Sequence, residues 1–114
     1  MICPFRLFDL QTQYFLATLA GDLELPSAIE MREDTLREEE RQRSQGKAKR
    51  HFHKLGSDQW DYIKFLEKMV GVEGVPKSVE VLYENVMDIR KLDLMNFKAY
   101  SVKERKDGMY YLKL

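Results

Sequence analysis

The spacing of hydrophobic and polar residues along the chain predicts four helices joined by short turns. We expect them at about residues 7–20, 27–45, 58–70 and 77–93. Glycine follows the first three segments, at Gly21, Gly46 and Gly71. Glycine is favoured just beyond helix C-termini because it accepts a positive φ angle. The fold class that follows is mainly α.

The first helical segment is hydrophobic on nearly every side. Leu10, Tyr14 and Ala17 form one stripe, and further apolar side chains cover the other faces, namely Phe8, Phe15, Leu16 and Leu19. A helix that is apolar all round is normally buried all round. The pattern therefore predicts that this helix needs cover from outside the chain, with Asp9 as a candidate cap at its start.

The second segment has a clear start signal and few apolar positions. Ser27 and Glu30 fit a capping box, in which each side chain bonds an otherwise free backbone N–H group. Three apolar residues near the start, Ile29, Met31 and Leu36, predict one thin contact stripe. The rest is mostly charged, so we expect at least half of this helix to face water.

The remaining segments are amphipathic. In the third, the apolar residues at near-helical spacing are Trp60, Ile63, Leu66 and Val70, and Ser57 or Asp58 is the expected cap. The fourth repeats apolar residues at positions 79, 82, 83, 86 and 89, the cleanest amphipathic pattern in the chain. Beyond it we expect a short irregular tail or a β-hairpin, with a turn at residues 106–108. No linker divides the chain, so residues 1–114 are predicted to form one segment.

Composition and charge exclude several classes of protein. Lys plus Arg and Asp plus Glu both number 19, so the net charge of zero gives no general attraction to nucleic acid or anionic lipid. Cys3 is the single cysteine, which excludes an internal disulfide. The start of the chain does not resemble a signal peptide, and no stretch is long and apolar enough to span a membrane. We therefore expect a cytoplasmic protein.

Three clusters of polar residues could carry chemistry, and each has a simpler interpretation. The basic run at 41–54 could bind phosphate, but it contains one aromatic residue and is more typical of a solvated helix end. His51 and His53 lack further metal ligands at suitable spacing, so no metal site is predicted. Asp58 and Asp61 could pair as carboxylates, but acids in a first helical turn also stabilise the helix dipole.

The sequence also lacks the common catalytic motifs. It contains no G-x-G-x-x-G fingerprint, no Walker loop and no G-x-S-x-G motif. The residues by themselves therefore predict no catalytic residue.

The order of the motifs nevertheless resembles that in the last third of flavin-containing monooxygenases. The stretch PFRLFDLQTQYFLATLAGDLELPS is similar to the P-x-x-x-x-D-L-Q helix and G-x-x-x-L-P-S turn that begin this part of the family. The block RHFHKLGSDQWDY and the ending LYENVMDIRKLDLMNFKAY resemble later blocks of its soluble branch. The resemblance extends over about residues 4–100. The matched positions of the first block are Pro4, Asp9, Leu10, Gln11, Gly21, Leu25, Pro26, Ser27, Glu30, Met31 and Asp34.

This resemblance implies a fragment of a larger α/β flavoenzyme with two dinucleotide-binding domains. The family uses FAD, NADPH and O₂ to oxygenate soft nitrogen or sulfur nucleophiles, and the FAD and NADPH glycine motifs would lie in a portion that precedes this segment. That portion is the expected partner, and small amines or sulfides are the expected substrates. By resemblance, Asp9, Leu10 and Gln11 lie near the flavin, close to a helix N-terminus whose N–H groups would stabilise negative charge on it. The alternative for Gln11 is a capping or packing role.

Two other functions remain open. The chain could be a stand-alone helical module that docks the apolar face of its first helix onto a partner protein. Less favoured is nucleic-acid binding through the basic run at 41–54. As a fragment of a monooxygenase, the chain alone is predicted to be inactive and to bind FAD weakly or not at all.

Overall fold

The computed structural model describes residues 4–113. These residues form two compact units, with the boundary between Val72 and Glu73. The first unit contains α1 (Pro4–Ala20), α2 (Ala28–Ser44) and α3 (Gln59–Val70). The second contains α4 (Lys77–Leu92) and the strands β1 (Ser101–Glu104) and β2 (Tyr110–Lys113). Four helices and a terminal hairpin confirm the predicted fold class. Cys3, for which no disulfide was predicted, lies outside the described residues.

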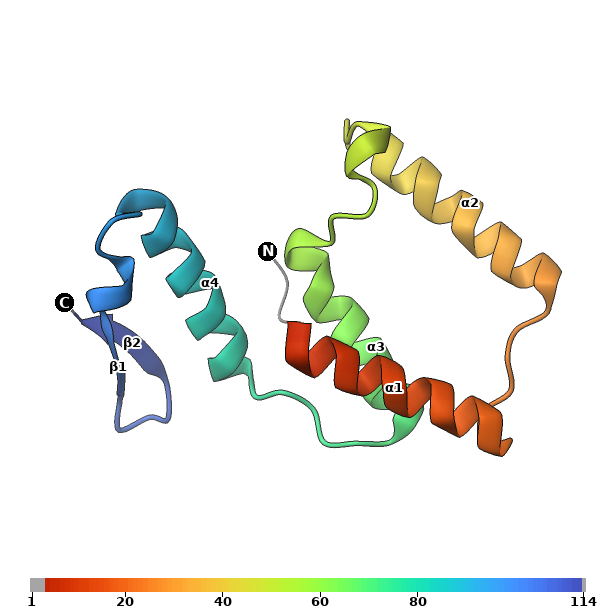
Figure 1. Cartoon of the computed structure of the whole chain (residues 1–114), viewed down its shortest axis with the longest axis horizontal. Coiled ribbons are helices and arrows are strands. Elements are labelled where there is room, and N and C mark those ends of the chain that lie inside the picture. Colours follow the sequence, from red (N-terminus) through yellow and green to blue (C-terminus); the bar gives the residue numbers. More distant parts are fainter. Residues whose placement is uncertain (1–3, 114) are drawn as a thin grey trace. The chain divides into compact units, whose positions relative to one another are not determined.

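The core of the first unit lies between α1 and α3, which pack side by side (Figure 1). Its buried hydrophobic side chains are Leu7 and Leu10 from α1 and Trp60, Ile63 and Leu66 from α3. The predicted stripe on α3 is therefore confirmed at three of its four positions, and Val70 is half-buried. These five side chains are the buried hydrophobic residues of the described chain. Such a small core gives a marginal free energy of unfolding.

Most of the apolar surface of α1 stays in contact with solvent. Phe8, Phe15 and Leu19 are 57%, 58% and 69% exposed. The helix carries hydrophobic residues all round, but the described chain covers only the side that meets α3. The uncovered side matches the expectation that this helix needs cover from elsewhere.

Helix α1 begins at Pro4, earlier than the pattern predicted. Proline suits the first helical turn because its φ angle is already helical and its missing N–H group is not needed there. The prediction that Asp9 caps the helix is wrong. Asp9 lies inside α1, where its Oδ2 atom accepts a hydrogen bond of 2.9 Å from Nε2 of Gln13.

The two ends of the loop between α1 and α2 follow local rules. Gly21 has a φ angle of 83°, and the N–H group of the next residue bonds the carbonyl of Ala17 at 2.9 Å, which ends α1. Ser27 and Glu30 form the predicted capping box: Oε2 of Glu30 accepts from the Ser27 N–H group at 2.8 Å, and Ser27 Oγ accepts from the Glu30 N–H group at 3.3 Å. These two reciprocal bonds fix where α2 begins.

The predicted contact stripe on α2 is wrong. Ile29, Met31 and Leu36 are all exposed, and the buried residue of this helix is Gln42, near its other end. The helix therefore meets the rest of its unit mainly through its C-terminal turns. Polar contacts with the following loop and α3 replace the expected apolar contact.

In the second unit, β1 and β2 pair antiparallel, with Val102 opposite Leu112 and Lys103 opposite Tyr111. Gly108 has a φ angle of 77° in the connecting turn, as the Lys-Asp-Gly sequence predicted. Helix α4 packs on β2, yet none of its residues is fully buried. Its amphipathic face is only half-covered within this unit.

Candidate functional site

Two neighbouring features of the first unit are candidates for function. One is the exposed side of α1, which carries Gln11. The other is a cleft of about 720 Å³ between α2 and α3. Tyr62 belongs to both, since it lines the cleft and its Oη atom accepts a hydrogen bond of 3.3 Å from Nε2 of Gln11.

The three residues carried over by resemblance occupy different surroundings on α1. Leu10 is fully buried against α3, whereas Asp9 and Gln11 are exposed. Helix α1 begins at Pro4, so its own N-terminus does not lie beside Asp9 and Gln11, and a helix N-terminus near the flavin stays a prediction. By position 9 the backbone N–H groups bond carbonyls inside the helix and are not free for a ligand.

An ion pair fixes the start of α1 to α3. Arg6 donates to Oε1 of Glu67 from Nη2 at 2.9 Å and from Nε at 3.3 Å. The Glu67 side chain is 6% exposed, so this carboxylate is desolvated and needs its charged donor. The contact joins residues 61 positions apart and holds the α1 surface that carries Asp9 and Gln11 in place.

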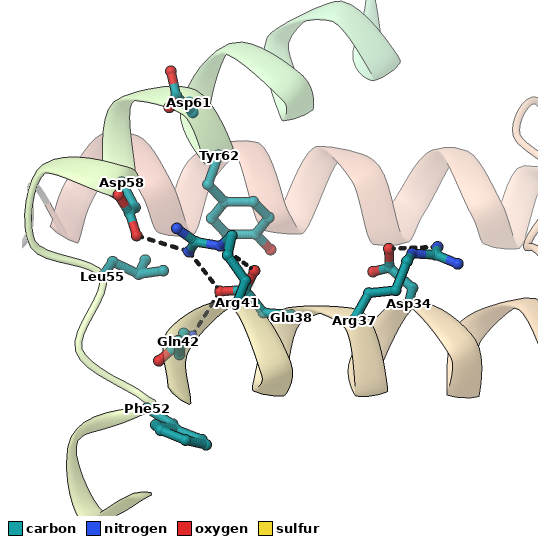
Figure 2. Close-up of a pocket in the computed structure, with 10 residues that line it drawn as sticks. All are labelled: Asp34, Arg37, Glu38, Arg41, Gln42, Phe52, Leu55, Asp58, Asp61 and Tyr62. Atoms are coloured by element: carbon teal, nitrogen blue, oxygen red, sulfur yellow. Dashed lines mark hydrogen bonds and ion pairs between the residues drawn. The ribbon is translucent and has the colours of Figure 1, made fainter. Parts of the chain in front are cut away.

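The cleft is organised around Arg41 (Figure 2). This guanidinium donates to both carboxylate oxygens of Glu38 at 2.7 Å and to Oδ2 of Asp58 at 2.9 Å, which ties α2 to the start of α3. Asp58, which with Ser57 was an expected cap of α3, occupies the N-cap position, but it makes no side-chain capping bond because its carboxylate binds Arg41.

The same contacts shift the protonation of the pair. Hydrogen bonds from Arg41, and then from Gln42, lower the pKa of Glu38 from its ordinary 4.5 to about 2. The two carboxylates raise the pKa of Arg41 above its already high value. Glu38 and Arg41 therefore stay charged at every physiological pH.

Gln42 is the buried polar residue of the cleft. Its side-chain N–H group donates to Oε1 of Glu38 at 2.6 Å, whereas its Oε1 atom is buried and has no hydrogen-bond partner. Figure 2 shows this side chain between α2 and the loop that carries Phe52 and Leu55. Buried amide oxygens without a donor are uncommon in folded proteins.

The other sequence candidates do not assemble into a site. Figure 2 shows Asp61 pointing away from the bond between Asp58 and Arg41, so the two aspartates form no carboxylate pair. In the basic run, Arg41 is engaged by acids and Lys47 donates to the Lys54 carbonyl at 3.1 Å. His51 accepts from Arg50 at 3.3 Å, and within residues 4–113 no group of three metal-binding side chains comes together.

Sequence reasoning missed most of the cleft. The spacing of Glu38 to Arg41 and Gln42 is that of neighbours on one helix face, so this local part could have been found. The bond of Arg41 to Asp58 and that of Gln11 to Tyr62 join separate helices. No local sequence pattern predicts these two contacts.

The structure thus defines a mainly helical segment with a small core, a charged cleft and one uncovered apolar helix face.

No family model matches the chain. Flavin-containing monooxygenase FMO GS-OX5 of Arabidopsis thaliana is 34% identical over 71 residues, which is 62% of this chain and 16% of that protein. FMO GS-OX-like 2 of the same plant is 38% identical over 83 residues, or 72% of this chain and 18% of the relative.

A solved structure agrees with these relatives. S-allyl-L-cysteine S-oxygenase from Allium sativum superposes with a TM-score of 0.81 and 30% identity, covering 85% of this chain and 22% of the oxygenase. The chain is therefore similar to a segment of flavin-containing monooxygenases, as the order of its motifs predicted. It spans less than one fifth of the length of the curated relatives it matches. No helix within residues 4–113 is long and apolar enough to cross a bilayer.

Proposed function

We propose that this chain is the C-terminal segment of a flavin-containing monooxygenase, which uses FAD, NADPH and O₂ to oxygenate a soft nitrogen or sulfur nucleophile in the cytoplasm. The observation that carries the proposal is the match to the Allium sativum S-oxygenase, at a TM-score of 0.81 over 85% of the chain. The name of the Allium sativum S-oxygenase favours sulfur over nitrogen as the oxygenated atom.

The described residues do not by themselves fit FAD. The sequence has no glycine loop to hold the pyrophosphate, and the hollow beside Gln11 is a shallow one on α1, lined by Phe8, Thr12 and Phe15. In the proposed enzyme this chain therefore contributes a surface to the cofactor site, and the preceding portion holds FAD and NADPH.

Within that surface we propose Gln11 as the residue that faces the flavin, with Asp9 beside it. Its side chain is exposed, and the bond to Tyr62 restrains the amide. Leu10 contributes by fixing α1 on the core, because its side chain is fully buried.

A chimera tests this proposal. The matching segment of the Allium sativum S-oxygenase would be replaced by this chain, and the purified product assayed for bound FAD and for NADPH-dependent oxygenation of S-allyl-L-cysteine. We expect the chimera to retain FAD and to oxidise NADPH, whereas this chain alone loses FAD on desalting. The oxygenase truncated before the segment is the control. A folded chimera with neither property, or a purified chain that retains stoichiometric FAD, would contradict the proposal.

The second candidate, a stand-alone interaction module, is favoured by the uncovered side of α1 with Phe8, Phe15 and Leu19. An antibody against the charged part of α2 separates the two in extracts of the source cells. A band several times larger than the 13.6 kDa of this chain supports the monooxygenase. A band at 13.6 kDa alone supports the module.

A further inference from the structure

Two hollows between α2 and α3 join into one groove, which we call the α2–α3 groove. The cleft of about 720 Å³ and a second hollow of about 550 Å³ share Asp34 and Arg37 in their linings. The second hollow lies nearer the start of α2, and its lining includes Met31 of α2 and Phe65 of α3. The groove therefore extends along most of α2, a helix of 17 residues and about 25 Å.

Apolar side chains line both parts of the α2–α3 groove. Met31 and Phe65 are 45% and 50% exposed, and the cleft adds Phe52, Leu55 and Tyr62. In Figure 1, α2 lies apart from α1 and α3 and is joined to them by the loops at its two ends. Protein interiors are packed to nearly crystalline density, so apolar walls beside an open space are typical of a surface that a partner covers.

The α2–α3 groove carries a negative charge. Six carboxylates and two guanidiniums line its two hollows, an excess of four negative charges. Both guanidiniums are already paired with acids of the same lining. The carboxylates belong to Glu30, Glu33, Asp34, Glu38, Asp58 and Asp61. An occupant with lysine or arginine side chains is therefore the electrostatic complement of this groove.

The length and charge of the groove distinguish between possible occupants. A groove that follows a helix for several turns is typical of sites that hold a peptide segment. A second copy of this chain would bring the same negative charges together in a two-fold symmetric contact. The Allium sativum S-oxygenase has most of its chain outside the match, since this chain covers 22% of it. The preceding portion of such an enzyme can therefore supply the segment.

We propose that the α2–α3 groove holds a segment of the preceding portion of the proposed monooxygenase, a segment that carries lysine or arginine beside apolar side chains. Its apolar side chains pack against Met31 and Phe65, and its basic side chains pair with Asp61 and the neighbouring acids. The charged helix α2 then helps to hold the two portions of the enzyme together. This inference rests on the proposed function, and its test gives a separate readout for each.

Cysteine labelling in the chimera with the Allium sativum oxygenase tests the contact. Cys3 is replaced by serine, and Met31→Cys or Phe65→Cys then places a thiol in the groove. Arg32→Cys, outside both linings, is the matched control, because neighbouring residues on a helix point about 100° apart. Reaction with a maleimide, located by mass spectrometry, is timed in the isolated chain and in the chimera. We expect labelling at positions 31 and 65 to slow at least about tenfold in the chimera, with little change at position 32.

Charge reversal tests the chemistry of the occupant. Asp61→Lys in the chimera should repel the basic segment and restore labelling at Phe65→Cys to near its rate in the isolated chain. Glu40→Lys, at an exposed acid of α2 outside both linings, is the control and should leave the labelling slow.

Two results in a folded chimera would overturn the inference: fast labelling at both groove positions, or protection that Asp61→Lys leaves intact. The proposed function is read separately from bound FAD, so a chimera that retains FAD but labels fast contradicts only the groove contact. If the chimera does not fold, overlapping synthetic peptides that cover the preceding portion of the oxygenase are titrated into the ¹⁵N-labelled chain. A basic peptide that shifts the amides of Met31 and Phe65, and is released by salt, supports the inference; no such peptide overturns it.

Discussion

Arg6 and Glu67 form an ion pair across 61 positions of sequence, with 2.9 Å between Nη2 and Oε1. It joins the first turn of α1 to the last turns of α3. Because the Glu67 side chain is 6% exposed, while Arg6 is 29% exposed, the carboxylate is the more desolvated partner. If the Arg6 guanidinium is removed, the buried Glu67 carboxylate is less well compensated. This lowers the free energy of unfolding more than removal of an exposed ion pair does.

Arg6→Met should therefore lower the free energy of unfolding by about 1–3 kcal/mol, although methionine keeps much of the apolar stem. Urea unfolding followed by circular dichroism measures the change. Arg43→Met, at an exposed arginine of α2, is the control and should stay within about 0.5 kcal/mol of the parent chain. Equal effects of the two substitutions would mean that the ion pair does not stabilise the first unit.

Shortening a side chain should affect stability differently on the two sides of α1. Leu10→Ala removes a fully buried side chain and should cost about 2–5 kcal/mol, which is enough to unfold a domain with so small a core. Leu19→Ala, at a residue that is 69% exposed, should change stability by less than about 0.5 kcal/mol. Thermal unfolding of both variants provides the comparison. A large effect at Leu19 would show that the isolated chain covers this side, for example by self-association.

If the chain is part of a monooxygenase, substitutions on the exposed side of α1 should have an effect only in the assembled enzyme. Phe15→Ser should leave the stability of the isolated chain nearly unchanged, since this side chain is 58% exposed. In the chimera with the Allium sativum oxygenase the same change should reduce FAD retention, because a polar group would be buried without a partner. Phe15→Leu keeps an apolar surface and should retain FAD. Equal FAD retention by both variants would argue that this side faces solvent in the enzyme as well.

Acid should weaken the link between α2 and α3. The folded pKa of Glu38 is about 2, below its ordinary 4.5, so its bonds to Arg41 and Gln42 contribute fully above about pH 4.5 and are lost as the pH falls toward 2. The side chains are about half-exposed, which limits the contribution to about 1 kcal/mol or less.

Glu38→Gln should therefore flatten the loss of stability between pH 4.5 and 2, as followed by urea unfolding at several pH values. Glu39→Gln, a neighbouring acid on the same helix, provides the control for a general charge effect. An unchanged pH profile for Glu38→Gln would contradict the low pKa.

The sequence determined the local structure of this protein. The four helices, the Ser27–Glu30 capping box and the Lys-Asp-Gly turn were all predicted, because hydrogen bonds between close neighbours and the φ angle of glycine depend on nearby residues. The resemblance to flavin-containing monooxygenases also followed from the order of motifs. Asp9 was wrongly expected to cap α1, and Asp58 occupies the N-cap position of α3 without a capping bond. A carboxylate near a helix start has several possible donors, and the sequence does not rank them.

Only the tertiary structure decided which surfaces meet. An all-apolar helix such as α1 has no preferred side, so its burial at Leu7 and Leu10 follows from where α3 lies. In the same way, Arg41 reaches Asp58 and leaves Gln42 with an unpartnered oxygen because the loop after α2 returns the chain to this point. Contacts between distant segments depend on how whole helices pack, and for this reason the cleft could not be read from the spacing of its residues.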